Sequence, residues 1–488
     1  MKRLLSGRRL AALCVLAALA VAGLGAYAAW LFRYSGVSEV EPVADANEPD
    51  ADYTLDITPY YDVGALYVRQ TIEFTNPGEA LDRLVLCLPG NAYRRATTAP
   101  LDSDSFDEAF EDSYSPGGLE FKVVSVDGHE VEWGVSGTSE ALLTLLCDVA
   151  EGASTTVYLE YYALIPEFEG AGGFGDDEWR LGEFYPYLAW LKDGEWTAYT
   201  PTYVGQYACA PIADYDVTLR AQSRFDVIST GVASIQDSAD GWNTWRITAR
   251  DARELGIVMR TGGCAYERDV GGVKVRVYGH DRTQARRAID VAAAALEFTS
   301  EIYAYPYAKL DIVLGDYAGR DWSISGLIIA DGSDWEAQLP YLIARQWWGG
   351  LVGCDSMIEP WLSEALAQYC ALECARVAGL DSYSALRSAV DSAVGITLPG
   401  GLTVESEGSA FSSWQDYINV LRHRGAAVLE LMDMAMDGQL TAALSEYARA
   451  NAYGFAQRAD FVAALNAVSG EDWSAWLNET LQGIGQAG

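Results

Sequence analysis

Histidine is scarce in this chain: only His129, His280 and His423 occur among 488 residues. Two helical histidines that bind one metal usually stand four positions apart, where they project from the same face. No pair here has the spacing of metal ligands. The sequence therefore indicates no histidine-based metal centre, and turn or surface positions explain the three residues.

Basic residues are also few, with 33 Lys and Arg against 69 Asp and Glu and a formal net charge of −36. Nucleic acid and anionic lipid attract cationic surfaces, so this balance excludes both as partners of the folded part. The acidity is most simply a means of solubility. Apolar residues are abundant at 50%, which excludes disorder for most of the chain. A chain of this length predicts two folded domains besides any anchor.

The eight cysteines show no paired spacing, so no disulfide can be assigned. Cys370 and Cys374 stand four residues apart on a predicted helix, and Cys354 precedes them. Two interpretations remain open, a soft-metal site and small core side chains. Glu364 lies nearly three helical turns from Cys374, which favours core packing.

Residues 1–36 have the pattern of a membrane signal. Basic residues precede an uncharged run from Leu10 to Phe32, which is long enough at about 1.5 Å per residue to cross a hydrocarbon core of about 30 Å. Because basic flanks stay in the cytoplasm, we expect a single-pass anchor with a cytoplasmic N-terminus and the remaining chain outside. The alternative is a signal peptide cleaved near Ala-Tyr-Ala at 26–28.

Residues 37–52 are acidic and aperiodic, which is typical of a linker. From 53 to 262, short runs of alternating apolar and polar residues are separated by glycine-rich turns, and they predict an antiparallel sheet domain. From 263 to 488 a strand, a helix and a second strand lead into a series of amphipathic helices. The predicted fold class is therefore α+β.

The stretch from Leu339 to Glu373 predicts two helices joined by a loop, with Arg345 and residues 346–348 on the first and Glu364 on the second. Its Gln-Trp-Trp-Gly and Trp-Leu-x-Glu-x-x-Ala-x-Tyr segments resemble the zinc-site region of the membrane alanine aminopeptidase family, the gluzincin metallopeptidases. Segments at 88–93, 182–196 and 213–219 resemble the amino-terminal saddle of that family. The resemblance implies a β saddle domain followed by a thermolysin-like α/β and helical domain.

Laid on the family's HExxH pattern, the two histidines fall on Tyr341 and Arg345, the general base falls on Leu342, and the third zinc ligand falls on Glu364. Only the glutamate is kept. Tyrosine is a poor neutral ligand, leucine accepts no proton, and arginine adds a permanent cation. We therefore predict that Arg345 pairs with Glu364 in place of a metal; the alternative is an ordinary salt bridge between neighbouring helices.

Two further family positions are altered. The glutamate that holds the substrate's α-amine corresponds to Ser323, and the tyrosine that stabilises the tetrahedral intermediate corresponds to Arg422. Loss of the carboxylate weakens attraction for a peptide amino terminus. Ser323 is otherwise an ordinary edge-strand hydroxyl. Arg422 either faces the cleft with Arg345 or lies on a solvated helix face.

The preferred hypothesis is a membrane-anchored, extracytoplasmic, aminopeptidase-like protein that is catalytically inactive and binds a peptide or an envelope protein. We expect no cofactor, whereas active relatives use zinc. One alternative is a metallo-aminopeptidase with altered ligands, which would need a new base, a new metal site and a new oxyanion donor. Another is an accessory subunit of a membrane transporter.

Overall fold

The computed structural model describes residues 51–101, 103–110, 113–168, 170, 172–317, 321–396 and 399–483. The predicted anchor at 1–36 lies outside these residues, as does the linker except for its last two residues. Those two already belong to a strand, because β1 begins at Ala51. Among the described helices, none combines the length and the apolar character needed to cross a membrane.

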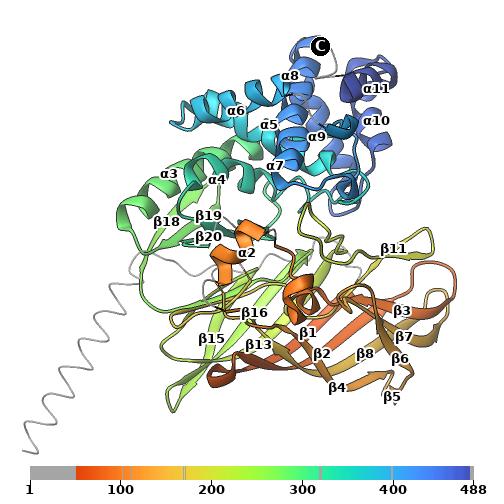
Figure 1. Cartoon of the computed structure of the whole chain (residues 1–488), viewed down its shortest axis with the longest axis vertical. Coiled ribbons are helices and arrows are strands. Elements are labelled where there is room, and N and C mark those ends of the chain that lie inside the picture. The colour runs from red at the N-terminus through yellow and green to blue at the C-terminus, as the bar shows by residue number, and fades with distance from the viewer. Residues whose placement is uncertain are drawn as a thin grey trace, which may run out of the picture.

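The amino-terminal half is built on an eight-stranded sheet (Figure 1). Alternate residues of its strands are buried, as in β8, where Val157, Leu159 and Tyr161 point into the core. The strands pair antiparallel except β1 and β13, which run parallel and so differ from the all-antiparallel prediction. In sheet order the strands are β15 (Val232–Ala239), β16 (Trp242–Ala252), β13 (Ala213–Gln222), β1 (Ala51–Tyr60), β2 (Ala65–Thr75), β8 (Ser154–Leu164), β4 (Gly118–Val126) and β5 (His129–Glu130).

Smaller sheets complete this half and share one hydrophobic core with the large sheet. The four-stranded sheet contains β10 (Tyr187–Leu188), β3 (Leu81–Cys87), β7 (Leu142–Val149) and β6 (Trp133–Ser136). The three-stranded sheet contains β14 (Asp226–Ser229), β17 (Ile257–Arg260) and β9 (Glu178–Leu181), and a hairpin joins β11 (Trp190–Lys192) to β12 (Glu195–Thr197). A short helix, α2 (Ser103–Phe110), lies beside them.

The second half opens with a five-stranded sheet of β18 (Cys264–Val270), β19 (Val273–Gly279), β20 (Lys309–Gly315), β22 (Leu327–Asp331) and β21 (Trp322–Ile324). Helix α3 (Arg282–Ser300) connects the parallel strands β19 and β20, and Asp281 caps it by accepting from the N–H groups of Thr283 and Gln284. Strands β21 and β22 form a hairpin, and β21, which carries Ser323, is the edge strand of this sheet. Gly326, with φ +70°, allows the tight turn of the hairpin.

Helices fill the remainder and cover this sheet (Figure 1). Their apolar faces form a second large core that includes the fully buried Trp347 and Trp348. The helices are α4 (Trp335–Ala344), α5 (Trp361–Ala378), α6 (Tyr383–Gly395), α7 (Trp414–Tyr417), the π-helical segment η6 (Ile418–Arg424), α8 (Gly425–Ala435), α9 (Leu440–Asn451), α10 (Arg458–Ser469) and α11 (Ser474–Gly483). The predicted α+β class is thus confirmed.

Candidate functional site

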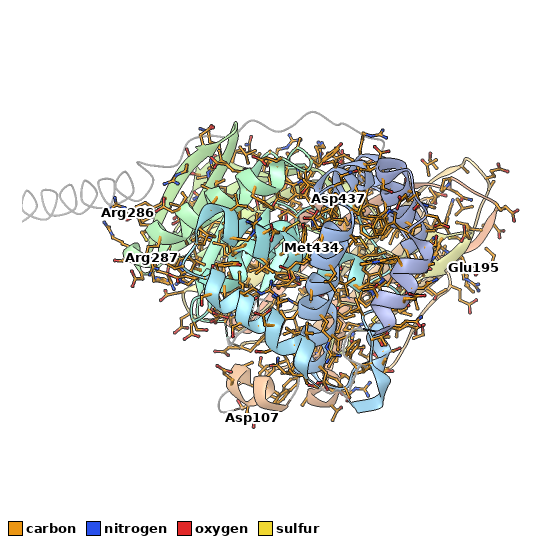
Figure 2. All side chains as sticks on the ribbon, turned by 90° about the horizontal axis from the view of Figure 1, so that it is seen from above. Asp107, Glu195, Arg286, Arg287, Met434 and Asp437 are labelled. Atoms are coloured by element: carbon orange, nitrogen blue, oxygen red, sulfur yellow. The ribbon has the colours of Figure 1, made fainter. Side chains whose placement is uncertain are left out.

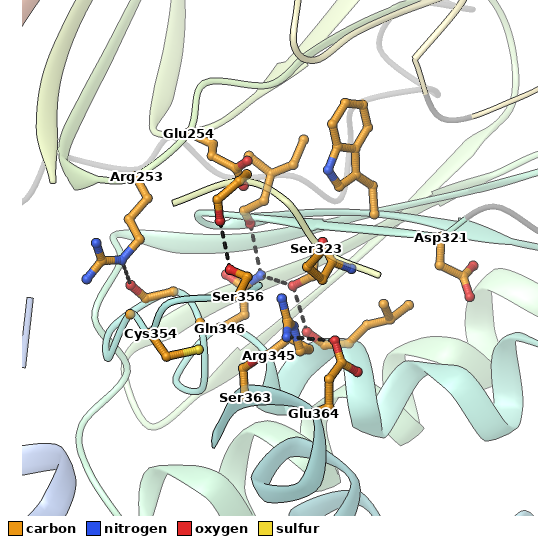
Figure 3. Close-up of a pocket in the computed structure, with 18 of the residues that line it drawn as sticks. Arg253, Glu254, Asp321, Ser323, Arg345, Gln346, Cys354, Ser356, Ser363 and Glu364 are labelled. Carbon is orange, nitrogen blue, oxygen red and sulfur yellow. Dashed lines mark hydrogen bonds and ion pairs between the residues drawn. The ribbon is translucent and has the colours of Figure 1, made fainter. Parts of the chain in front are cut away.

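A cavity of about 240 Å³ lies where the β-rich half meets the helices. One wall comes from β21, α4, α5 and η6, and the other comes from loops of the β-rich half that carry Glu183 and Glu254. Figure 3 shows Glu254 on a β-rich segment facing the helical wall with Arg345 and Glu364. The cavity is therefore lined by side chains from both halves of the chain.

Helix α4 ends one residue before Arg345, and residues 346–348 lie beyond it in turns. The prediction of one helix through Trp348 was wrong at this end. Beyond Ala344 the backbone continues in turns in which the N–H groups of Gln346 and Trp347 donate to carbonyls three residues back, and Gly349 then adopts a φ of +113° that suits glycine. A Cβ at Gly349 would stand 3.2 Å from Cζ of Arg345, so the glycine also leaves space for the guanidinium.

Glu364 lies in the first turn of α5, and its side chain is only 2% exposed. Nη1 of Arg345 donates to Oε1 of Glu364 at 3.2 Å, which makes the ion pair. The hydroxyl of Tyr341 donates to Oε2 at 2.5 Å, and that of Tyr417 donates to Oε1 at 3.4 Å. Both carboxylate oxygens of the retained ligand are therefore held by protein donors.

These residues do not fit zinc. A catalytic zinc site needs three protein ligands and an open position for water. Here the guanidinium of Arg345 contacts the carboxylate that would bind the metal. Although burial opposes its charge, the neighbouring Tyr341 and Glu364 raise the pKa of Arg345, so the side chain remains a cation. No group of three or more His, Cys, Asp or Glu residues with metal-site geometry occurs among the described residues.

Two further positions of the altered pattern, Leu342 and Ser323, have structural contacts. The side chain of Leu342 is buried, and its carbonyl accepts from Oγ of Ser323 at 2.8 Å. Nε2 of Gln346 donates to the same Oγ at 2.7 Å and to the carbonyl of Ile324 at 2.9 Å. Ser323 thus ties the edge strand β21 to α4 and leaves no carboxylate at that position.

Arg422 lines the cavity together with Arg345, which decides between the two predicted placements. Its guanidinium stacks on the ring of Tyr341, 3.6 Å from the centroid, and donates to amide oxygens of Gln338 and Gln368 at 3.0 to 3.3 Å. An α-helix, at about 3.6 residues per turn, would point residues five positions apart to different sides. The π-helical segment η6 widens the turn and brings Tyr417 and Arg422 to the same cavity.

Three carboxylates line the cavity besides Glu364. Burial raises the pKa of Glu254 to about 7, although the charges of Arg345 and Arg253 lower it. Burial also raises the pKa of Glu183 to about 7 against a hydrogen bond from Tyr207. The pKa of Asp321 rises to about 6 for the same reason. The site therefore holds acids that titrate near neutral pH.

Arg253, the residue before Glu254, joins the two halves of the chain. Its guanidinium donates to the carbonyls of Ala210 at 3.0 Å, Gly350 at 2.7 Å and Gly454 at 2.5 Å. The N–H of Leu255, on the other side of Glu254, donates to the hydroxyl of Tyr185 at 3.0 Å. Hydrogen bonds of Arg253 and Leu255, the residues on either side of Glu254, therefore hold this loop in place.

The cysteines near the site are buried and free. Burial raises the pKa of each of Cys354, Cys370 and Cys374 to about 12, so these thiols stay protonated at neutral pH. Sγ of Cys370 accepts from Nε1 of Trp348 at 3.3 Å. These contacts favour the core-packing interpretation of the three cysteines over the soft-metal one.

Sequence reasoning did not assign Glu183, Glu254 or Tyr417 to the site. Glu183 lies within a segment that carried the family resemblance, and its left-handed φ of +52° is unusual for glutamate. Glu254 stands in the charged run Arg-Asp-Ala-Arg-Glu, which carries no periodic signal. The position of Tyr417 depends on the π-helical segment, for which the sequence pattern gave no indication.

The two-domain arrangement is the fold of the M1 zinc metallopeptidases. An M1 zinc metallopeptidase variant from Deinococcus radiodurans is similar to this chain with a TM-score of 0.62 and 17% identity, over 91% of this chain and 97% of that chain. A two-domain M1 variant bound to L-tryptophan has a TM-score of 0.63 and 16% identity, with the same coverage.

A third solved structure, of a variant of the Deinococcus enzyme bound to a Tyr-Ser-Ala substrate, has a TM-score of 0.62, 16% identity, and coverage of 91% and 96%. No model of a known protein family matches the sequence. No curated protein matches it either. At these identities the similarity establishes the fold, and it agrees with the family resemblance in the sequence at that coarser level.

Proposed function

We propose that this protein is a catalytically inactive, aminopeptidase-like binding protein whose cleft holds a peptide or peptide-like ligand without cleaving it. One observation carries the proposal: Arg345 and Tyr341 occupy both oxygens of Glu364. The general base of the pattern is replaced by Leu342, and the oxyanion donor by a cation, Arg422. Each missing group normally contributes orders of magnitude in rate, so hydrolysis is not expected.

Binding is supported by the cavity itself, which remains open beside the pair of Arg345 and Glu364. Glu183 and Glu254 place carboxylates on the wall opposite the helices. Such groups attract an ammonium, so they offer another means of holding an amino terminus after the loss at Ser323. Solved structures with this fold hold L-tryptophan, L-arginine and a Tyr-Ser-Ala substrate.

The test is to measure zinc content and hydrolysis of aminoacyl reporter substrates on the purified full-length chain. We expect less than stoichiometric zinc and no chelator-sensitive turnover. A matched variant restores the metal pattern with Tyr341→His, Leu342→Glu and Arg345→His, and we expect it to gain zinc. Stoichiometric zinc with chelator-sensitive turnover in the unaltered chain would establish the alternative, an active peptidase with other ligands.

We also propose that residues 1–36 anchor the protein and place the remaining chain outside the cytoplasm. The support is the uncharged run from Leu10 to Phe32 behind basic residues. Carbonate extraction of membranes should leave the chain in the pellet, and protease added to intact cells should cleave it. A soluble product that begins near residue 29 would instead establish cleavage of a signal peptide.

A further inference from the structure

The two walls of the cavity carry opposite charges that their own partners do not balance. On the helical wall, Arg345 is balanced by Glu364, but Arg422 donates only to the neutral amides of Gln338 and Gln368. Within the described part of the chain, Arg422 forms no ion pair. The helical wall therefore presents to the cavity a cation without an ion pair, although the charge of Arg422 acts on the nearby Asp321, whose pKa burial raises to about 6.

The opposite wall presents an acid, Glu254, which lies near the charges of Arg345 and Arg253 but forms no ion pair with either. Glu254 makes no hydrogen bond or ion pair with any residue that the structure describes, although Arg253 and Leu255 on either side are firmly held. A half-buried carboxylate without a direct partner is costly, and a bound cation lowers that cost. Glu183 is a second acid on this wall: burial raises its pKa to about 7, and the charge of the nearby Glu254 adds to that rise.

We propose that the cavity binds a free α-amino acid as a zwitterion, with its ammonium against Glu254 and its carboxylate against Arg422 and the outer face of Arg345. The proposal rests on the non-hydrolytic binding function argued above. The ligand is neutral overall, and it supplies one charge for each unbalanced group. A site that holds an ammonium alone would leave Arg422 unmatched.

The dimensions of the site favour a single amino acid over a peptide. A cavity of about 240 Å³ is smaller than the pockets of about 300 to 1,000 Å³ that hold drug-sized ligands. In an amino acid the two charges share one carbon, whereas each added residue separates the ends of a peptide by about 3.5 Å. Trp322, Trp414 and Phe455 also line the cavity and provide apolar surface for a large side chain.

Calorimetric titration of the full-length chain in detergent with four probes tests both ends of the ligand. The probes are L-phenylalanine, its amide, its N-acetyl derivative and the dipeptide Phe-Ala. We expect L-phenylalanine to bind about tenfold or more tightly than each of the others, because every other probe loses or displaces one charge. Equal or tighter binding of the dipeptide would overturn the proposal and leave the broader function of peptide binding intact.

Two variants assign the ends. Glu254→Gln should weaken binding of L-phenylalanine and its amide about tenfold and leave the N-acetyl derivative unchanged. Arg422→Gln should weaken binding of L-phenylalanine and its N-acetyl derivative about tenfold and leave the amide unchanged. Glu195→Gln, at the exposed periphery in Figure 2, is the matched control and should change nothing. Identical effects of Glu254→Gln on all probes would contradict the assigned orientation. Binding of no probe at all would overturn both this inference and the proposed function.

Discussion

The two walls of the cleft differ in how their charged groups are satisfied. On the helical wall, Glu364 has donors from Arg345, Tyr341 and Tyr417, and both arginines are held in place by neighbours. On the β-rich wall, Glu254 has no such partner among the described residues, and burial shifts its pKa toward neutrality. The acid of the helical wall is thus satisfied by the protein itself, and we call this wall closed for that reason, whereas we call the opposite wall open because Glu254 has no such donors among the described residues.

The largest expected effect comes from breaking the closed wall at Arg345. Arg345→Ala leaves Glu364 buried without its cation, which should lower the free energy of unfolding by about 3 to 5 kcal/mol. Urea denaturation of the full-length chain measures this loss. The double variant Arg345→Met with Glu364→Gln should recover most of it, because no charge then remains buried.

Arg376→Ala is the matched control for that prediction. Arg376 pairs with Glu373 on the same helix, α5, but its side chain is 54% exposed. Exposed pairs contribute little, so the free energy of unfolding should change by no more than about 1 kcal/mol. If Arg345→Ala were no more destabilising than this control, the helical wall would not be held by its ion pair.

On the open wall, the raised pKa of Glu254 predicts an unusual dependence of the free energy of unfolding on pH. The pKa of Glu254 is about 7 in the folded protein and 4.5 ordinarily, so the folded state retains a proton that the unfolded state releases. This proton adds to the free energy of unfolding, by on the order of 3 kcal/mol. The stabilisation is complete below about pH 4.5 and is lost as the pH rises through about 7. Glu254→Gln should therefore unfold at a higher temperature than the unaltered chain at pH 8.

At pH 5 the same pair of proteins should have nearly equal melting temperatures, since glutamine resembles the protonated acid. Exposed Glu195→Gln serves as the control and should show no such divergence between pH 5 and pH 8. A melting-temperature difference for Glu254→Gln that is independent of pH would mean that Glu254 stays charged in the folded protein. The contrast between the two walls would then disappear.

Tyr341→Phe tests how much the tyrosine hydroxyl contributes to holding Glu364 on the closed wall. It removes the donor to Oε2 of Glu364 and keeps the ring on which Arg422 stacks. Hydrogen bonds to charged groups contribute about 1.5 to 3 kcal/mol, so a loss in that range is expected in urea denaturation. A neutral effect would show that Arg345 alone satisfies the carboxylate.

The smallest of these effects should come from Gly349→Ala. The new Cβ would press on the guanidinium of Arg345, and φ of +113° disfavours any side chain. We expect a loss of about 1 to 2 kcal/mol, also measured by urea denaturation. Gly438→Ala tests the backbone part alone, because Gly438 has φ +81° and open space around its Cβ position.

Local patterns in the sequence were sufficient for the fold class and for the altered metal residues. Alternation predicted the strands, and the resemblance to the zinc-site region of the aminopeptidase family implied that Tyr341, Arg345 and Glu364 lie together. What could not be predicted depends on long-range geometry. The parallel pairing of β1 with β13 and the approach of Glu254 to the helical wall arise from contacts between distant segments.

Two local features also escaped prediction for physical reasons. The π-helical segment at 418–424 changes which residues share a face, and no residue pattern marks it. The helix α4 gives way to three-residue turns after Ala344, and the apolar Trp347 and Trp348 beyond that point do not mark the change in the sequence. The sequence therefore left two placements open for Arg422, and the structure shows that Arg422 lines the cavity.

The contacts of Arg253 determine how a ligand can enter and leave the cavity. Its guanidinium spans the junction and donates hydrogen bonds to three backbone carbonyls, so separating the halves would strip a buried cation of its contacts. We therefore expect the gap between the walls to be set once, during folding. A ligand would then enter and leave the preformed cavity by diffusion, and no hinge opening or lid movement would limit the rate.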